Sequence, residues 1–377
     1  MLLTEDQALI RDTANAFAQH QLWPNAEEWD RDSHVPVDKL KAMGALGLMG
    51  ITVPEEWGGA GADTVSFALA MIEISAGDGG CGTVASVMGL LCNAMYKFGN
   101  DAQKEKYLRP LAGGQTIGAF ALTEPQAGSD AANLKVRADE KGDVFVLNGT
   151  KQFISAGSIA DFALVFAVTD PDLGKKGITA FLVDADAPGY RVSTIEKKLG
   201  QHSSDTCQLV FEDLEVPAEN MLGARGEGYK IALANLEGGR VGIAAQSVGM
   251  ARSAMEVAIE YAKERETFGK PIIEHQGVSF RLADMATQVE VATQMVLHAA
   301  ALRDAGISCL KEASMAKLFA SEMAEKVCSG AIQTLGGYGY LNDFPVERIY
   351  RDVRVCQIYE GTSDVQRLVI GRALAVG

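Results

Sequence analysis

The feature that most constrains the fold of this chain is the spacing of its apolar residues, which changes twice along the sequence. From the N-terminus to about residue 115, apolar residues recur at helical spacing. Short apolar runs separated by turns follow, and long helical patterns occupy the rest of the chain. This order predicts a mostly helical α+β protein. We expect an N-terminal helical domain at 1–117, a middle antiparallel β-barrel or sandwich at 118–225, and a C-terminal four-helix bundle at 226–377.

Two local glycine patterns carry structural predictions. Residues Gly77 to Gly82 match the G-x-G-x-x-G of dinucleotide-binding loops, but that loop follows a strand, whereas a helical pattern precedes it here. We therefore interpret these glycines as a connection between helices. Asn148 and Gly149 lie between two apolar runs, 145–147 and 151–154, which predicts a hairpin turn.

Charge and composition narrow the classes of partner and compartment. The net charge is −15 and no basic cluster occurs, which argues against nucleic acid and anionic membranes as partners. No apolar run approaches the roughly 20 residues that span a bilayer, and the N-terminus lacks the layout of a targeting peptide. The histidines and cysteines are scattered without metal-ligand spacing, so we expect no metal. These features predict a cytoplasmic protein with reduced thiols.

Near the C-terminus, Glu360 lies in a break between two helical patterns. Gly361 follows it, and a glycine lets backbone approach a ligand closely. Ser363 and Gln366 have the spacing of a capping box, which predicts the start of the last helix. A carboxylate on a short loop between rigid elements is either a solvated surface group or a well-placed catalytic group. The motif alone leaves both interpretations open.

Five motifs, in one order, resemble the acyl-CoA dehydrogenase family over essentially the whole chain. They are Thr123-Glu124-Pro125 with Gly128-Ser129-Asp130; Phe153-Ile154-Ser155; Glu264-Arg265 with Phe268-Gly269; Gln333 to Gly337 with Gly339-Tyr340; and Ile358 to Ser363. The bacterial members that act on short or branched acyl chains are the most similar. The resemblance implies FAD as cofactor and an electron-transferring flavoprotein as the partner that receives the electrons.

The resemblance also implies which residues contact FAD. They are Phe120, Leu122, Thr123, Gly128, Ser129, Phe153, Ile154, Ser155, Arg265, Phe268, Gln276, Gln333, Leu335, Gly336, Gly337, Thr362 and Ser363. Phe153 stands where the family commonly has tryptophan, and the hairpin pattern alone makes it a core residue. Arg265 matches a ligand of the cofactor's pyrophosphate, although a cation at a helix C-terminus also has a structural role. In the family, Arg265, Phe268, Gln276 and the Gln333 to Gly337 loop complete the site across a subunit interface, which implies a homotetramer built as a dimer of dimers.

The expected reaction removes two hydrogens from adjacent carbons of an acyl-CoA and gives a trans-2-enoyl-CoA. It requires a base for the α-proton, an acceptor for the β-hydride, and donors to the thioester carbonyl. The resemblance assigns the base to Glu360, the acceptor to FAD, and one donor to the Glu360 backbone N–H. It assigns substrate contacts to Ser129, Glu237, Arg240 and Gly361. A salt-bridged Glu237–Arg240 pair is the alternative for those two residues.

Other assignments remain open at this point. Isovaleryl- and long-chain-type relatives carry the base just before the arginine that matches Arg240, where this chain has Gly239. Glu237 is offset from that position by two residues, about 200° around a helix, and so points elsewhere. The same fold also serves an acyl-CoA oxidase that uses O₂, and a non-catalytic acyl-CoA-binding relative is a third alternative.

Overall fold

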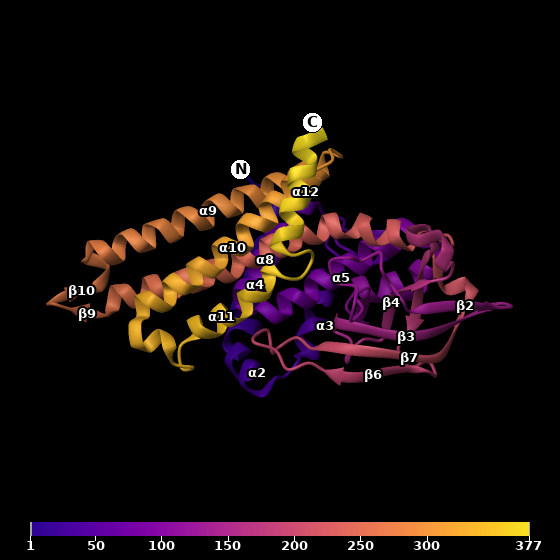
Figure 1. Cartoon of the computed structure of the whole chain (residues 1–377). Helices are drawn as coiled ribbons and strands as arrows, with labels where there is room; N and C mark the ends of the chain where they lie inside the picture. Colours follow the sequence, from indigo (N-terminus) through magenta and orange to yellow (C-terminus); the bar gives the residue numbers. More distant parts are fainter. Residues whose placement is uncertain (1, 377) are drawn as a thin grey trace.

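The computed structural model describes residues 2–376, apart from the side chains of Glu237 and Val376. Figure 1 shows a bundle of long helices at one end of the molecule, a β-sheet at the other, and further helices between them. The predicted order of helical, β and helical parts is confirmed. Among the described residues, no helix has both the length and the apolar character needed to cross a bilayer.

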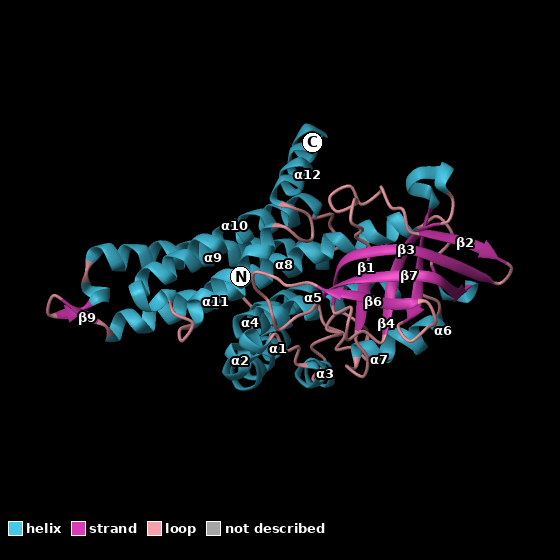
Figure 2. Cartoon of the chain, turned by 60° about the horizontal axis from the view of Figure 1, so that its bottom comes forward, coloured by secondary structure: helices cyan, strands magenta, loops and turns pink. Residues whose placement is uncertain are grey.

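The N-terminal part is helical. Its helices are α1 (Glu5–Phe17), α2 (Ala26–Asp32), α3 (Val37–Ala45), α4 (Thr64–Gly77), α5 (Gly79–Phe98), α6 (Asp101–Gln103) and α7 (Arg109–Ala112). Two of them, α4 and α5, lie between the bundle and the sheet (Figures 1 and 2). The expected connection at Gly77–Gly82 is only Asp78, whose side chain accepts a hydrogen bond from Cys81 N and so caps α5. The glycines that follow belong to α5 and allow close packing, since a Cβ on Gly80 would lie 2.2 Å from Ser203 Oγ.

The middle part is one mixed sheet. Its strands are β1 (Gly118–Ala121), β2 (Arg137–Lys141), β3 (Val144–Ser155), β4 (Phe162–Val168), β5 (Ile178–Asp184), β6 (Tyr190–Ile195), β7 (Thr206–Pro217) and β8 (Met221–Leu222). They lie in the order β6-β7-β3-β2-β4-β5-β8, and β1 pairs with β4. The pairing is mainly antiparallel, as expected, but β1 and β2 both run parallel to β4. The strands are seen together in Figure 2.

Strand β4 is buried on both faces and joins two apolar cores. Leu164 and Phe166 belong to the core shared with the helices, whereas Val165 and Ala167 belong to a second core within the sheet. The alternation follows from the two-residue period of a strand. The sheet is therefore attached to the helices by one face of β4 together with β5, whose Ile178, Ala180 and Leu182 belong to the same core.

The hairpin predicted at Asn148–Gly149 is wrong. Strand β3 runs through both residues, and its pairing with β7 shifts register there. Gly149 has φ of +138°, and a Cβ on it would lie 3.0 Å from Val136 Cα. The dipeptide therefore marks a bulge where a neighbouring backbone approaches closely. The hairpin turn that the pattern missed lies earlier, at Gly142 and Asp143, between β2 and β3.

The C-terminal part contains α8 (Gly228–Glu264), α9 (Gln276–Asp304), α10 (Leu310–Leu335), α11 (Pro345–Val353) and α12 (Ser363–Val376). A short hairpin of β9 (Glu266–Thr267) and β10 (Lys270–Pro271) joins α8 to α9. Helix α8 continues through Gly238 and Gly239 without interruption. The predicted four-helix bundle is built differently, because α8, α9 and α10 pack together while α12 contacts α10 and projects from the bundle (Figures 1 and 2). The long helix α4 packs against α8 and α9 instead.

Candidate active site

Glu360 lies between the 3₁₀ turn η9 (Arg354–Gln357) and α12, in a strained backbone conformation. Its φ is +53°, and that of Gly361 is +89°. A non-glycine residue in this region costs on the order of 1–3 kcal/mol, so neighbouring contacts must hold it. Gln366 Nε2, from α12, donates to the carbonyl oxygens of Glu360 at 3.1 Å and Gly361 at 2.9 Å. Lys317 Nζ, from α10, donates to the Gly361 carbonyl at 2.7 Å. Two helices thus fix the loop.

These contacts correct the capping box predicted from Ser363 and Gln366. The residue that caps α12 is Thr362, whose Oγ1 accepts from Val365 N at 3.3 Å. Ser363 is the first residue of the helix. The Gln366 side chain therefore holds the Glu360 loop, whereas a capping box would bond it to the backbone N–H of Ser363.

The surroundings of Glu360 favour a proton acceptor. Burial raises the pKa of its carboxyl to about 7, and the positive charges of Arg240 and Lys317 act in the opposite direction. Its Oε2 atom is buried and accepts no hydrogen bond from the described residues. Leaving a buried carboxylate oxygen without a hydrogen-bond donor costs free energy. A catalytic role is one explanation for such an atom, and here it suits an oxygen that meets a substrate. A base with a pKa near neutral is also well matched to proton abstraction at neutral pH.

Helix α8 faces the Glu360 carboxylate with the backbone of Gly239, which has no side chain. A Cβ on Gly239 would lie 2.6 Å from Glu360 Oε2, 3.1 Å from its Cδ and 3.2 Å from Leu90 Cδ2. No side chain fits between Gly239 and the carboxylate without movement. The position at which some relatives carry their base is therefore filled by the Glu360 carboxylate itself.

Behind the loop, a buried chain of hydrogen bonds begins at Tyr359. Its hydroxyl donates to Gln246 Oε1 at 2.5 Å, and Gln246 Nε2 donates to Thr83 Oγ1 at 2.8 Å. Thr83 Oγ1 donates to Gln201 Oε1 at 2.6 Å, and the Gln201 backbone N–H donates to the carboxyl of Asp352. Burial raises the pKa of Asp352 to about 7 and that of Tyr359 well above its usual value. The loop is thus tied to α5, α8 and α11.

Helix α5 connects the Glu360 loop with the first strand of the sheet. Leu90 faces Gly239, while a Cβ on Gly118, at the start of β1, would lie 2.5 Å from Leu91 Cδ1. The Gly118 N–H also lies 3.5 Å from Met88 Sδ. Strand β1, which leads into the segment after Ala121, therefore begins close to the helix that lines the Glu360 carboxylate.

A buried ion pair holds that segment beside β3. Lys151 Nζ donates to Glu124 Oε1 at 2.8 Å and to the Leu122 carbonyl at 2.9 Å. The Gln152 backbone N–H donates to the Thr123 carbonyl at 2.9 Å. Burial lowers the pKa of Lys151 to about 8, and the charge of Glu124 opposes this change. The two predicted flavin segments, 120–129 and 153–155, are brought together by these bonds.

Several residues of these segments are open to a ligand. Phe153 has φ of +58° and is 62% exposed, so it is not the core residue that the hairpin pattern indicated. Ser129 and Gly128 are exposed, and a Cβ on Gly128 would meet no atom within 4 Å. Ile154 is buried and Ser155 is half-buried. Of the remaining predicted residues, Phe120 packs on Phe166 with ring centroids 5.1 Å apart.

A second group of predicted residues lines a cavity of about 600 Å³ at the opposite end of the bundle. It is lined by Tyr261, Arg265, Thr267, Ile272, Thr334, Leu335, Gly336, Gly337, Tyr338 and Leu341. The Arg265 guanidinium lies over the Tyr338 ring, 6.0 Å from its centroid. Phe268, Gln276 and Gln333 are nearby in sequence and exposed; Phe268 is 98% exposed, with φ of +52°. Arg265 also ends α8, as its alternative structural role required.

The structure does not bring the two groups together within one chain. Gly239 and the C-cap residue Arg265 are 26 positions apart along α8, about 39 Å at 1.5 Å per residue. In Figures 1 and 2 the β9–β10 hairpin and the sheet lie at opposite ends of the molecule. In FAD, only a ribityl chain separates the flavin ring from the pyrophosphate. One cofactor molecule therefore cannot contact both groups of the same chain.

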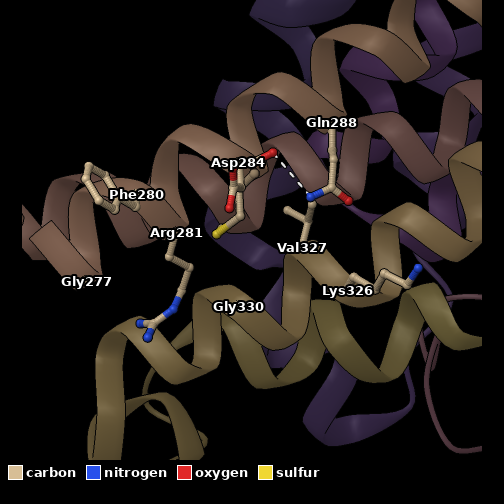
Figure 3. A pocket seen from close by; sticks show the side chains of 9 residues that line it. Gly277, Phe280, Arg281, Asp284, Gln288, Lys326, Val327 and Gly330 are labelled. Carbon is tan, nitrogen blue, oxygen red and sulfur yellow. Dashed lines mark hydrogen bonds between the residues drawn. The ribbon is translucent and has the colours of Figure 1, made fainter.

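Another cavity, of about 420 Å³, lies between α9 and α10 on the bundle surface (Figure 3). Its lining residues are Gly277, Phe280, Arg281, Asp284, Met285, Gln288, Lys326, Val327 and Gly330. Phe280 is 62% exposed at its rim. None of the residues assigned to the substrate or the cofactor lines this cavity, so we do not count it as part of the site.

The two predicted substrate contacts on α8 have different outcomes. Arg240 is buried and close enough to Glu360 for its charge to lower the pKa of that carboxyl. The side chain of Glu237 lies outside the part of the chain that the structure describes. The alternative Glu237–Arg240 salt bridge therefore stays a prediction.

The sequence interpretation missed the residues that support Glu360 from behind. Lys317, Gln366 and the partners of Tyr359 were not assigned to the site. A usable signal existed for Lys317, because it occurs in an alanine-rich helical stretch with Ala313, Ala316 and Ala320. A lysine in such an apolar pattern is a candidate for burial with a specific partner. The glutamines have no comparable signal.

These features define a protein in which a buried carboxylate lies among long helices that pack against a separate β-sheet. The chain matches three family models: the acyl-CoA dehydrogenase N-terminal domain over residues 4–115, the middle domain over 119–214 and the C-terminal domain over 226–375. An acyl-CoA dehydrogenase of Bacillus subtilis is 49% identical over the full length of both chains. The chain therefore belongs to the acyl-CoA dehydrogenase family, and the predicted class of flavoprotein oxidoreductase is confirmed.

Two solved structures are especially similar. A chain in the structure of an electron transferring flavoprotein of Acidaminococcus fermentans has a TM-score of 0.98, 47% identity and 99% coverage of both chains. Butyryl-CoA dehydrogenase from Megasphaera elsdenii has a TM-score of 0.97 and 42% identity, with 100% of this chain and 99% of that chain covered.

FAD is the cofactor of this family, and the described residues fit it. The flavin ring needs a flat face and backbone donors, which exposed Phe153 and the open backbone around Gly128 offer. The pyrophosphate needs a cation with open backbone beside it. Arg265 provides the cation, and a Cβ on Gly336 or Gly337 would meet no atom within 4 Å.

Proposed function

We propose that this protein dehydrogenates a short- or branched-chain acyl-CoA to the trans-2-enoyl-CoA, with Glu360 as the base that takes the α-proton. The observation that carries the proposal is the buried Glu360 carboxylate, whose Oε2 accepts no hydrogen bond from the described residues. FAD, when bound, accepts the β-hydride. The electrons then pass to an electron-transferring flavoprotein.

Each chain element has a defined task in this reaction. The raised pKa of Glu360 makes its carboxylate a stronger base than an ordinary glutamate. The Glu360 backbone N–H donates to the thioester carbonyl and stabilises the negative charge that develops there. Ser129, Glu237, Arg240 and Gly361 contact the acyl-CoA. The short- or branched-chain preference is supported by the likeness to butyryl-CoA dehydrogenase.

The cofactor contacts fall into two groups that meet only between chains. The flavin ring is contacted by the segments 120–129 and 153–155 with Thr362 and Ser363. The pyrophosphate end is contacted by Arg265, Phe268, Gln276 and the loop 333–337 of a neighbouring chain. This division supports a homotetramer, a dimer of dimers, and the exposed cavity between α9 and α10 is a candidate contact surface for it. We place the protein in the cytoplasm, where its six buried cysteines would stay reduced.

A flavin spectrum of the purified protein, followed by anaerobic addition of acyl-CoAs from butyryl- to palmitoyl-CoA, tests the function. We expect a bound flavin that is bleached fastest by short or branched acyl-CoAs and reoxidised by an electron-transferring flavoprotein. Rapid O₂ consumption during turnover would indicate an oxidase instead. A flavin that no acyl-CoA bleaches, in a protein that still binds acyl-CoA, would indicate the non-catalytic relative.

Replacing Arg265 by alanine should weaken FAD binding about 10- to 10²-fold, because it removes a charge-assisted bond to phosphate worth about 1.5–3 kcal/mol. The measurement is FAD titration of apoprotein by fluorescence, with light scattering to record assembly. Lys263→Ala is the matched control, since this lysine is in the last turn of α8 and pairs with Glu260 at the surface. Unchanged FAD affinity in Arg265→Ala, or a flavin-loaded monomer in light scattering, would overturn the proposed assembly of the site.

A further inference from the structure

Lys317 is a charged residue in the interior that the reaction described above does not use. Its side chain is 0% exposed, on a face of α10 that also carries Ala313 and Ala320. Lysine is almost never fully buried unless it has a specific partner, and here Nζ donates to the Gly361 carbonyl at 2.7 Å. Apolar side chains of similar volume can often replace a buried ion pair as a whole without loss of stability. Packing alone therefore gives no reason for a lysine at this position.

The hydrogen bond from Lys317 is made to the residue next to Glu360 in the loop. Gly361 directly follows Glu360, and both residues have positive φ. The same carbonyl accepts a second bond, from Gln366 Nε2 at 2.9 Å. The lysine thus holds the loop from α10, while the glutamine holds it from α12. Together they fix the direction of the Glu360 side chain and of its backbone N–H.

We propose that Lys317 is a positioning residue for the base: it holds the Glu360 loop through the Gly361 carbonyl and thereby places a positive charge beside that loop. This inference rests on the proposed role of Glu360. Lys317 itself touches neither the substrate nor the cofactor, so its effect passes entirely through the loop and the local charge.

The charges around the two groups agree with this role. Burial raises the pKa of Glu360, while Arg240 on α8 and Lys317 on α10 lower it. Burial lowers the pKa of Lys317 to about 8; Cys356 on η9, Glu360 and Glu322 raise it, and Arg240 lowers it. Glu360 and Lys317 thus each favour the charged form of the other. Removing the lysine charge leaves Arg240 as the only cation that acts on Glu360 among the groups named here.

The test compares two variants. Lys317→Met removes both the charge and the hydrogen-bond donor at similar side-chain volume. Lys317→Gln removes the charge but keeps a donor, on a shorter side chain. The rate of anaerobic flavin bleaching by butyryl-CoA is measured against pH, with KM, FAD content and melting temperature. Because a positive charge is lost, the acid limb of the rate should move up by about one pH unit in both variants. The limiting rate should fall about 10²-fold in Lys317→Met, since the loop loses an anchor. KM and FAD content should change little.

Lys311→Gln is the control, because it removes a partly exposed lysine from the first turns of the same helix, where it pairs with Glu312. It should leave the profile unchanged. If Glu360→Gln slows bleaching but both Lys317 variants match the wild type in rate and acid limb, the positioning role is wrong while the proposed function stands. If Glu360→Gln itself bleaches at the wild-type rate, the proposed function fails. A Lys317→Met that unfolds leaves the Lys317→Gln profile to decide.

Discussion

Replacing Glu360 by glutamine should slow anaerobic flavin bleaching by about 10²- to 10⁴-fold, the usual contribution of a general base. Glutamine preserves the size of the side chain but cannot take a proton. In the wild type, the rate should rise with pH through about 7 and level off above it, because burial raises the pKa of Glu360 to about 7 and only the ionised form is a base. The residual rate of the variant should lack this limb. Stopped-flow absorbance over a pH series measures both effects.

Glu237→Gln is the variant to compare with Glu360→Gln, since Glu237 is the other carboxylic residue considered for the base. It should mainly raise KM, because its proposed task is to hold the substrate. FAD content should be normal in both variants, as neither residue is assigned to the cofactor. A near wild-type rate in Glu360→Gln, together with a slow Glu237→Gln, would show that the base has been misassigned.

Replacing Gly239 by alanine should also cost about 10²-fold in bleaching rate, although it adds only a methyl group. The new Cβ would lie 2.6 Å from Glu360 Oε2, so the carboxylate must move. A displacement of about 1 Å in a reacting group is enough for a loss of this size. Alanine favours a helix more than glycine does, so the melting temperature should not fall.

Gly371→Ala on α12 serves as the control for the added methyl group, since a Cβ there would meet no atom within 4 Å. We expect wild-type bleaching in this control. Bleaching of Gly239→Ala at the wild-type rate, with the same acid limb, would mean that the carboxylate has more room than its contacts with α8 indicate.

The order of helical and β parts was predictable because it depends on periodicity, which a sequence displays directly. Details that depend on tertiary contacts were not. Asn148 and Gly149 carry a strong turn signal, but pairing with β7 extends β3 through them and converts the signal into a bulge. Ser363 and Gln366 have the spacing of a cap, yet the helix takes its cap from Thr362. At Asn148 and Gly149 a local preference lost to a long-range strand pairing, whereas Gln366 instead bonds the carbonyls of Glu360 and Gly361.

The candidate site shows the same division. Glu360 and the flavin segments were assigned through motifs, which are contiguous in the sequence. Lys317 and Gln246 act on the loop from distant helices, and only the fold reveals which backbone or hydroxyl group they meet. The hairpin pattern alone would have buried Phe153, because a strand pattern does not display the positive φ that this exposed residue adopts.

The length of α8 matters for function because residues assigned to two different active sites lie near its two ends. Under the proposed roles, Gly239 and Arg240 serve one active site, while Arg265 serves that of a neighbouring chain. An inserted or deleted residue between them would turn one end relative to the other by about 100° and shift it by about 1.5 Å. The number of residues in α8 thus fixes both the distance and the relative rotation between the two sites. This stretch should accept substitutions far more readily than changes in length.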